Sequence, residues 1–164
     1  MELLYSLPFL LVSYIIYESN GKAREYSSSD DDLIFYGEYL NGKRNGKGKE
    51  YEVGRVIFEG EYLNGKRNGK GKEYYSNGKL KFEGEYLNGQ RSGKGKEYHN
   101  YDSSLVFEGE YLNGERLTGK GYDDKGNLVY DSKTSNALVK EYSPAGTLMF
   151  EGERSEERRV GKEC

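Results

Sequence analysis

One eight-residue segment, aromatic-x-Gly-Glu-Tyr-Leu-Asn-Gly, occurs four times in this 164-residue chain. The copies begin at Phe35, Phe58, Phe82 and Phe107, so that successive copies lie 23, 24 and 25 residues apart. Each is followed by a second segment of the type Asn-Gly-Lys-Gly-Lys-Glu-Tyr, complete at Asn68–Tyr74. A period of this length indicates a repeat architecture in which every unit is the same small motif.

Residues within a unit alternate as they do in a half-buried β-strand. Phe58, Gly60 and Tyr62 fall on one face, and the intervening glutamates fall on the other. The segment Asn64–Gly69 joins the two halves of the unit, and its two Asn-Gly pairs are typical of hairpin turns. Each unit is therefore predicted to be a β-hairpin, which is marginal alone and is stabilised by pairing with its neighbours.

The predicted fold is all-β: an elongated, single-layer antiparallel solenoid of β-hairpin repeats. Its expected core consists of the aromatic residues and the glycine of each first segment. These are Phe35, Gly37, Tyr39, Phe58, Gly60, Tyr62, Phe82, Gly84, Tyr86, Phe107, Gly109 and Tyr111. The expected turn glycines are Gly42, Gly46, Gly65, Gly69, Gly89, Gly93, Gly114 and Gly119.

Weaker copies flank the four good units, so the repeat region is predicted to cover residues 20–153. Asn20–Tyr26 matches the second segment with Ala23 in place of a glycine. Counting back in the same register places Tyr14 and Ile15 where a good unit has Tyr39 and Leu40.

The pattern Y-x-E-x-x-N-G-x-x-x-G-x-G that begins at Tyr36, with its copies, resembles the MORN (membrane occupation and recognition nexus) repeat. The resemblance extends from about Gly21 to Glu153. It implies an elongated antiparallel sheet of hairpins, as the alternation does. Proteins with similar repeats are scaffolds, adaptors or the targeting regions of larger enzymes, such as phosphatidylinositol-phosphate kinases.

Composition excludes several kinds of chemistry. One His and one Cys provide neither a His/Cys metal site nor a cysteine–histidine dyad. A formal net charge of −3 does not favour nucleic acid as a partner. We therefore expect no catalytic residues, no metal and no cofactor within these residues.

Glutamates and lysines lie on neighbouring strands of the solvent-exposed face. Glu59 and Glu61 lie two residues apart on a strand, and the neighbouring strand carries Lys70 and Lys72 with the same spacing. Cross-strand Glu–Lys pairs contribute roughly 0.2–1 kcal/mol each and fix the register of a sheet. A structural ladder is therefore favoured over an acid/base pair.

Basic residues recur at the connection between the two halves of each unit. Because they occupy the same place in successive units, they are expected to line one edge of the solenoid and to contact anionic phospholipid headgroups. An ordinary soluble edge is the alternative. The candidate lipid-contact residues are Lys43, Arg44, Lys66, Arg67, Arg91 and Arg116.

The two ends of the chain differ from the repeats. Residues 1–19 contain the apolar run Leu3–Tyr17, which is too short for a membrane-spanning helix and is interrupted by Pro8. A capping strand or first repeat, a signal or anchor, and an assembly error are the three interpretations. Residues 154–164 (RSEERRVGKEC) resemble the in-frame translation of a common sequencing adapter and are predicted to be non-native.

Together these observations predict a non-catalytic scaffold or adaptor that binds proteins, with a homodimer and anionic phospholipids as further expected partners. We expect it in the cytoplasm, at a membrane or the cytoskeleton, and the apolar N-terminus leaves secretion open. The alternative is the N-terminal targeting or regulatory region of a larger enzyme. Repeats predict architecture more directly than function.

Overall fold

The computed structural model describes residues 13–132, 138–142 and 148–153. All regular structure in these ranges is β-strand, and no helix occurs within them. Residues 1–12 of the expected N-terminal segment and all of 154–164 lie outside the described residues. The prediction of an all-β chain of antiparallel hairpins is confirmed.

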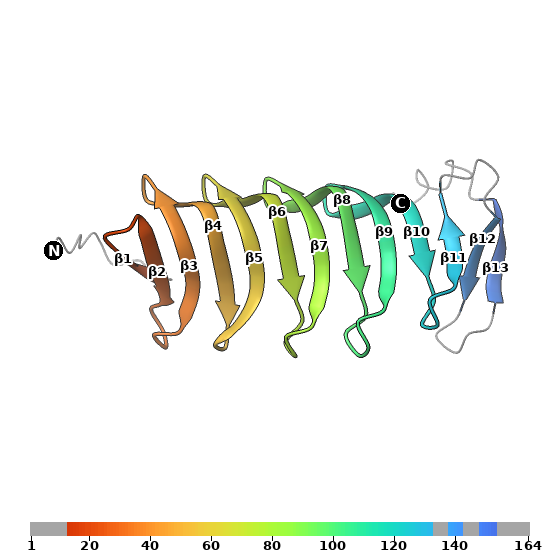
Figure 1. The fold of residues 1–164 in the computed structure, drawn as a ribbon, viewed down its shortest axis with the longest axis horizontal. Coiled ribbons are helices and arrows are strands. Elements are labelled where there is room, and N and C mark those ends of the chain that lie inside the picture. The colour runs from red at the N-terminus through yellow and green to blue at the C-terminus, as the bar shows by residue number, and fades with distance from the viewer. Residues whose placement is uncertain (1–12, 133–137, 143–147, 154–164) are drawn as a thin grey trace, which may run out of the picture.

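Eleven strands form one open antiparallel sheet in which each strand pairs with the next along the chain (Figure 1). A separate two-stranded sheet follows. The strands of the large sheet are β1 (Ser13–Tyr17), β2 (Lys22–Ser27), β3 (Leu33–Leu40), β4 (Lys43–Glu52), β5 (Arg55–Leu63), β6 (Lys66–Tyr74), β7 (Leu80–Leu87), β8 (Gln90–Tyr98), β9 (Leu105–Leu112), β10 (Glu115–Tyr122) and β11 (Leu128–Asp131). Strands β12 (Leu138–Tyr142) and β13 (Leu148–Glu153) form the small sheet.

The hairpin turns are shorter than the sequence suggested. Only Asn64 and Gly65 connect β5 to β6, with φ angles of 51° and 87°. Positive φ at both positions is the requirement that selects Asn-Gly in a two-residue turn. The second Asn-Gly pair belongs to strand β6 instead, where Gly69 (φ 103°) produces a bulge and the pairing with β5 shifts register.

This correction applies to every second-segment glycine that we expected in a turn. Gly46, Gly69 and Gly93 have positive φ but lie inside strands β4, β6 and β8. Gly119 has no positive φ, and it lies opposite Gly109 in the paired register of β9 and β10.

The first hairpin also has a different register from the expected one. Ile15 lies opposite Glu25. Phe35 has the equivalent place opposite Glu50, so Ile15 replaces a phenylalanine and not Leu40. The reason is a shorter hairpin: Glu25 follows Ile15 by 25 − 15 = 10 positions, whereas Glu50 follows Phe35 by 50 − 35 = 15, so counting back by a fixed period goes too far.

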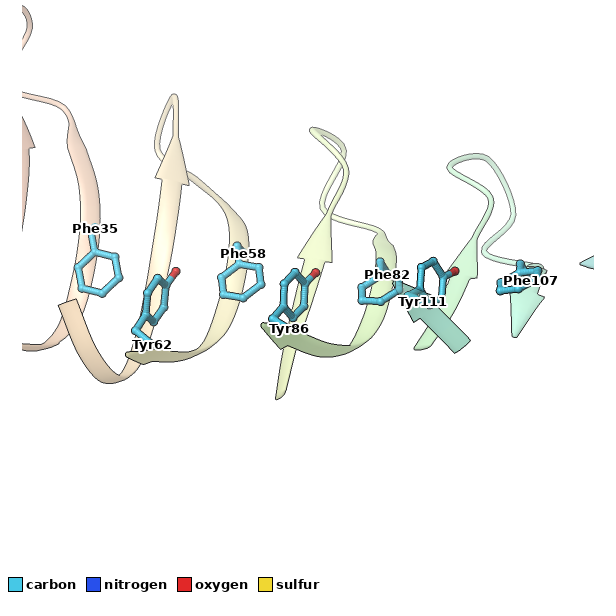
Figure 2. Close-up of a cluster of buried hydrophobic side chains, with 7 residues drawn as sticks. All are labelled: Phe35, Phe58, Tyr62, Phe82, Tyr86, Phe107 and Tyr111. Carbon is cyan, nitrogen blue, oxygen red and sulfur yellow. The ribbon is translucent and has the colours of Figure 1, made fainter. Parts of the chain in front are cut away.

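The core of this single-layer sheet is a row of aromatic rings on one face, which we call the core face. Phe35, Phe58, Phe82 and Phe107 are 0–1% exposed, and they alternate with Tyr62, Tyr86 and Tyr111 along the sheet (Figure 2). Each ring meets the next edge-on. The Phe58 ring centroid lies 5.7 Å from that of Tyr62 and 5.1 Å from that of Tyr86 in the next unit.

Glycines let these rings lie directly on the backbone. A Cβ atom at Gly71 would lie 2.5 Å from the ζ carbon of Phe58, and one at Gly48 would lie 2.2 Å from the ζ carbon of Phe35. The absence of a side chain at these positions therefore creates the space that each ring fills. This explains how a phenylalanine becomes fully buried without a second layer.

Candidate functional site

The face opposite the aromatic rings carries two parallel rows of charged side chains, and we call it the charged face. The rows run along the sheet, perpendicular to the strands, because paired residues on neighbouring strands point to the same side. One row contains Lys47, Glu61, Lys70, Glu85, Lys94 and Glu110. The other contains Lys49, Glu59, Lys72, Glu83, Lys96 and Glu108.

Between the rows lies a groove of about 910 Å³ whose floor is glycine backbone. We call it the charged groove; Gly48, Gly60, Gly71, Gly84, Gly95 and Gly109 are among the residues that line it. Strands β4, β6 and β8 contribute only lysines to its walls, and β5, β7 and β9 contribute only glutamates. The groove therefore presents stripes of alternating sign.

Part of this charge is paired across the strands. Lys49 Nζ lies 3.1 Å from Glu59 Oε2, and Lys72 Nζ lies 3.7 Å from Glu83 Oε2. The lysine side chains of these pairs are 49% exposed, so they remain accessible to a ligand. In the other row, Lys70 makes no ion pair within the described part of the chain. The predicted Glu–Lys ladder is present, with only one of its two rows ion-paired.

Tyrosines at one side of the groove donate hydrogen bonds to the second row. Tyr74 Oη lies 2.5 Å from Glu59 Oε1, and Tyr98 Oη lies 2.7 Å from Glu83 Oε1. The hydrogen bond from Tyr74, together with Lys49, holds the pKa of Glu59 below its usual value. Burial and the hydrogen bond to Glu83 raise the pKa of Tyr98 to about 12. The Glu59 carboxylate is therefore ionised and the Tyr98 hydroxyl is protonated at neutral pH.

A second set of charges lies on the core face and connects neighbouring units. Arg67, the second residue of β6, places its guanidinium 4.0 Å from the centroid of the Phe58 ring. The same guanidinium donates to both carboxylate oxygens of Glu50 on β4, at 3.1 Å from Nε and 2.6 Å from Nη2. Tyr62 Oη donates to Glu50 Oε1 at 2.8 Å. One carboxylate of the earlier unit thus holds a tyrosine and an arginine of the later unit.

The same arrangement, which we call the inter-unit bridge, recurs along the sheet. Arg44 covers Phe35 and bonds Glu25, and Arg91 covers Phe82 and bonds Glu73. The remaining bridge joins Arg116, which covers Phe107, to Glu97.

The bridges change towards the C-terminal end of the sheet. The Tyr111 hydroxyl is buried there and makes no hydrogen bond of good geometry in the described residues, although burial and the nearby Glu97 carboxylate raise its pKa. Phe107 on β9 pairs with Glu97 on β8 and with Gly121 on β10. Gly121 therefore has the position of a bridge glutamate, and at this position β10 provides no carboxylate for a further bridge.

Burial and pairing act in opposite directions on these carboxylates. Burial alone would raise the pKa of Glu50, but the hydrogen bonds and positive charge of Arg67 outweigh it and hold the pKa below its usual value. The pKa of Glu73 is held low in the same way by Arg91 and Tyr86. These two bridge glutamates are therefore ionised in the folded protein.

These contacts decide where the expected lipid-contact residues lie. Arg44, Arg67 and Arg91 are 16–25% exposed and pair with glutamates, while Arg116 is 46% exposed and pairs with Glu97. The expected row of free arginines is instead part of the core face. Lys43 and Lys66 do lie exposed at the hairpin tips. Each tip also exposes a leucine by 51–59%, namely Leu40, Leu63, Leu87 and Leu112.

The bridges were missed in the sequence, although a signal for them was present. Glu50, Glu73 and Glu97 alternate onto the same face as the buried aromatic residues. A carboxylate on an apolar face needs a partner, because burying an unpaired charge is costly. That requirement points to the arginine of the neighbouring unit.

The described residues contain no group of three or more His, Cys, Asp or Glu side chains arranged to hold a metal ion. In the same residues no helix has the length and apolar character to cross a membrane.

Comparison with known proteins gives a family and no curated relative. No curated protein sequence matches the chain. Solved structures that match include the crystal structure of TarM and that of an S. aureus TarM point mutant in complex with Fondaparinux, alpha-GlcNAc-glycerol and UDP. Each has 12% identity and a TM-score of 0.44, and the match covers 67% of this chain but 22% of the other. The family model described as MORN repeat matches residues 35–51, 58–79 and 82–103. These three stretches coincide with the β3–β8 hairpins, and residues 35–103 of this chain are built of MORN repeats.

Proposed function

We propose that this protein is a non-catalytic scaffold that binds a protein partner along the charged groove. The observation that carries the proposal is the groove itself: about 910 Å³, open along the sheet and walled by half-exposed charges. MORN repeats occur in scaffold and membrane-associated proteins, which agrees with a binding role.

The signs of the charges narrow the class of partner. The six strands β4–β9 place as many lysines as glutamates along the groove. A polyanion such as a nucleic acid would meet a repelling glutamate stripe beside every attracting lysine stripe. A polypeptide carries charges of both signs and can match both stripes.

Binding is tested by capturing partners from a lysate of the source cells on the immobilised full chain. In one variant, Lys47→Ala, Lys70→Ala and Lys94→Ala remove the unpaired lysine row. In the matched control, Lys43→Ala and Lys66→Ala remove exposed lysines at the tips. We expect one partner to bind the wild type and the tip variant and to be lost from the groove variant. Equal capture by the groove variant would refute the proposal.

A second candidate function is contact with an anionic membrane through the hairpin tips. The observation that favours it is the row of exposed leucines beside Lys43 and Lys66. Basic residues contribute roughly 1 kcal/mol each near an anionic surface. The test replaces the tip lysines and not the arginines, because replacing the arginines would expose the core phenylalanines that they cover.

The membrane test compares the wild type with Lys43→Glu/Lys66→Glu on phosphatidylserine vesicles and on neutral vesicles. Salt-sensitive binding to the anionic vesicles alone, lost in the variant, is the expected result. Binding that is unchanged by the variant would contradict a role for the tips. A homodimer and a cytoplasmic location stay predictions.

A further inference from the structure

The dimensions and charge order of the charged groove indicate the shape and charge pattern of the segment that binds in it. Resting on the function proposed above, we propose that it binds an extended polyproline II-type segment with one acidic and one basic residue in every three. The argument uses the width of the groove, its period and the order of its charges.

The width favours an extended chain over a helix. The two rows stand at positions i and i+2 of each strand, as Lys70 and Lys72 do on β6. Two residues of a strand span about 7 Å. An α-helix with its side chains is about 10–12 Å across and therefore cannot reach the glycine floor. A single extended backbone fits between the rows.

The floor also excludes strand addition as the binding mode. Strands β4–β9 are each paired on both edges, so their backbone hydrogen bonds are used within the sheet. A segment that crosses these strands cannot form a β-ladder with them. It is recognised through the side chains of the two rows.

The period of the charges identifies the conformation more closely. A lysine stripe recurs every second strand, which corresponds to about 9.6 Å. Three residues of polyproline II advance about 9.3 Å and complete one turn. Seven residues of an α-helix advance about 10.5 Å. In a β-strand, side chains on the same face recur about every 6.7 Å, which does not match the spacing of the lysine stripes. Only the polyproline II helix combines the period with the width.

The order of signs then defines the pattern of the segment. Acidic residues lie over the lysine strands β4, β6 and β8, and basic residues lie over the glutamate strands β5, β7 and β9. One of each is needed per unit, which gives acidic-x-basic repeated every three residues. Proline suits the middle position because it adopts the polyproline II φ angle and needs no backbone donor.

The experiment uses three fluorescent peptides whose acidic and basic side chains balance. The probe is a periodic peptide, in which the tripeptide Glu-Pro-Lys is repeated four times. The block control has the same composition, with all its glutamates first, then all its prolines and then all its lysines. The third is a helical peptide of similar length with glutamate and lysine at heptad spacing. Binding to the full chain is measured by anisotropy. We expect the periodic peptide to bind about tenfold more tightly than the block control, because only it aligns several weak ion pairs at once.

A groove variant breaks the phase while keeping the net charge. Lys70→Glu and Lys72→Glu are combined with Glu83→Lys and Glu85→Lys, which exchanges two stripes and preserves a cross-strand pair. The matched control is Lys43→Ala at a tip. We expect about a fivefold loss of affinity in the phase variant and none in the control, with the fold of both checked by circular dichroism.

Each outcome either supports or overturns the inference. Equal binding of the periodic and block peptides to the wild type overturns it, and this comparison needs no variant to fold. Tighter binding of the helical peptide also overturns it and assigns a helix to the groove. If no peptide binds but the lysine-to-alanine groove variant still loses the captured partner, this inference fails and the proposed function stands. If that variant retains the partner, the proposed function fails.

Discussion

Replacing Arg67 tests whether the inter-unit bridge holds the sheet together. The guanidinium covers Phe58 and makes two hydrogen bonds to Glu50, and both charged side chains are only 17–25% exposed. In Arg67→Ala, Glu50 loses its nearest cation and the ring loses its cover. Tyr62 still donates to Glu50, which limits the loss.

The magnitude follows from the contacts. A hydrogen bond to a charged group contributes about 1.5–3 kcal/mol. A cation over an aromatic ring contributes about 0.5–2 kcal/mol, depending on its exposure. These contributions are not additive, because the same guanidinium makes both contacts. We therefore expect Arg67→Ala to lower the free energy of unfolding by about 2–4 kcal/mol. Arg67→Lys keeps the charge but loses the planar fork and is expected to cost about 1–2 kcal/mol.

Urea unfolding followed by far-ultraviolet circular dichroism measures the effect, since the chain has no tryptophan for fluorescence. Lys66→Ala is the matched control, because this exposed neighbour of Arg67 lies at the tip and is expected to change stability by less than about 0.5 kcal/mol. The reasoning is refuted if Arg67→Ala and Lys66→Ala unfold at the same urea concentration. A double mutant with Glu50→Ala then isolates the pairing energy.

Three other predictions rest on the same kinds of contact. First, the pKa of Glu50 is lowered in the folded protein, so the stabilisation from its ionised form is complete above the unfolded pKa of about 4.3 and is lost as the pH falls through the folded pKa. The urea midpoint of unfolding should therefore fall on acidification below about pH 4.5. Glu50→Gln should make this dependence on pH weaker. Second, the pKa of Tyr98 is raised to about 12, so the stabilisation from its protonated hydroxyl is complete below about pH 10 and is lost as the pH rises towards 12. Ultraviolet titration of Tyr98→Phe should show one fewer tyrosine that ionises late. An unchanged titration curve would contradict the assignment. Third, Gly71→Ala should cost about 1–3 kcal/mol because its Cβ meets the Phe58 ring at 2.5 Å, whereas Gly121→Ala, whose Cβ meets its nearest atom at 3.4 Å, should be tolerated in the same unfolding assay.

Much of the architecture was predictable from local rules that each unit obeys. The alternation of Phe58, Gly60 and Tyr62 predicts one packed face because side chains on a strand alternate strictly. Asn64-Gly65 predicts its turn because few residues tolerate two successive positive φ angles. Both rules need only the residues of one unit.

The rest depended on relations between units or on alternatives that local rules do not separate. Two Asn-Gly pairs stood close together, and the sequence did not show that Gly69 forms a bulge while Gly65 forms the turn. That choice moves Arg67 from a loop into a strand and from solvent onto an aromatic ring. The predicted register of Ile15 was wrong for a similar reason, because the length of a hairpin is not fixed by the period.

The inter-unit bridges have a direction, since the earlier unit always provides the carboxylate and the later unit provides the arginine. Gly121, where the series would continue, provides none. The pairing of β10 with β11 therefore lacks an inter-unit bridge of the kind that couples the earlier units, although Gly119 N donates to Ser132 Oγ at 2.6 Å. Thermal fraying is expected to begin at that end and to stop at Glu97, which Arg91 and Arg116 share. Amide hydrogens of β10 and β11 would then exchange before those of the bridged units.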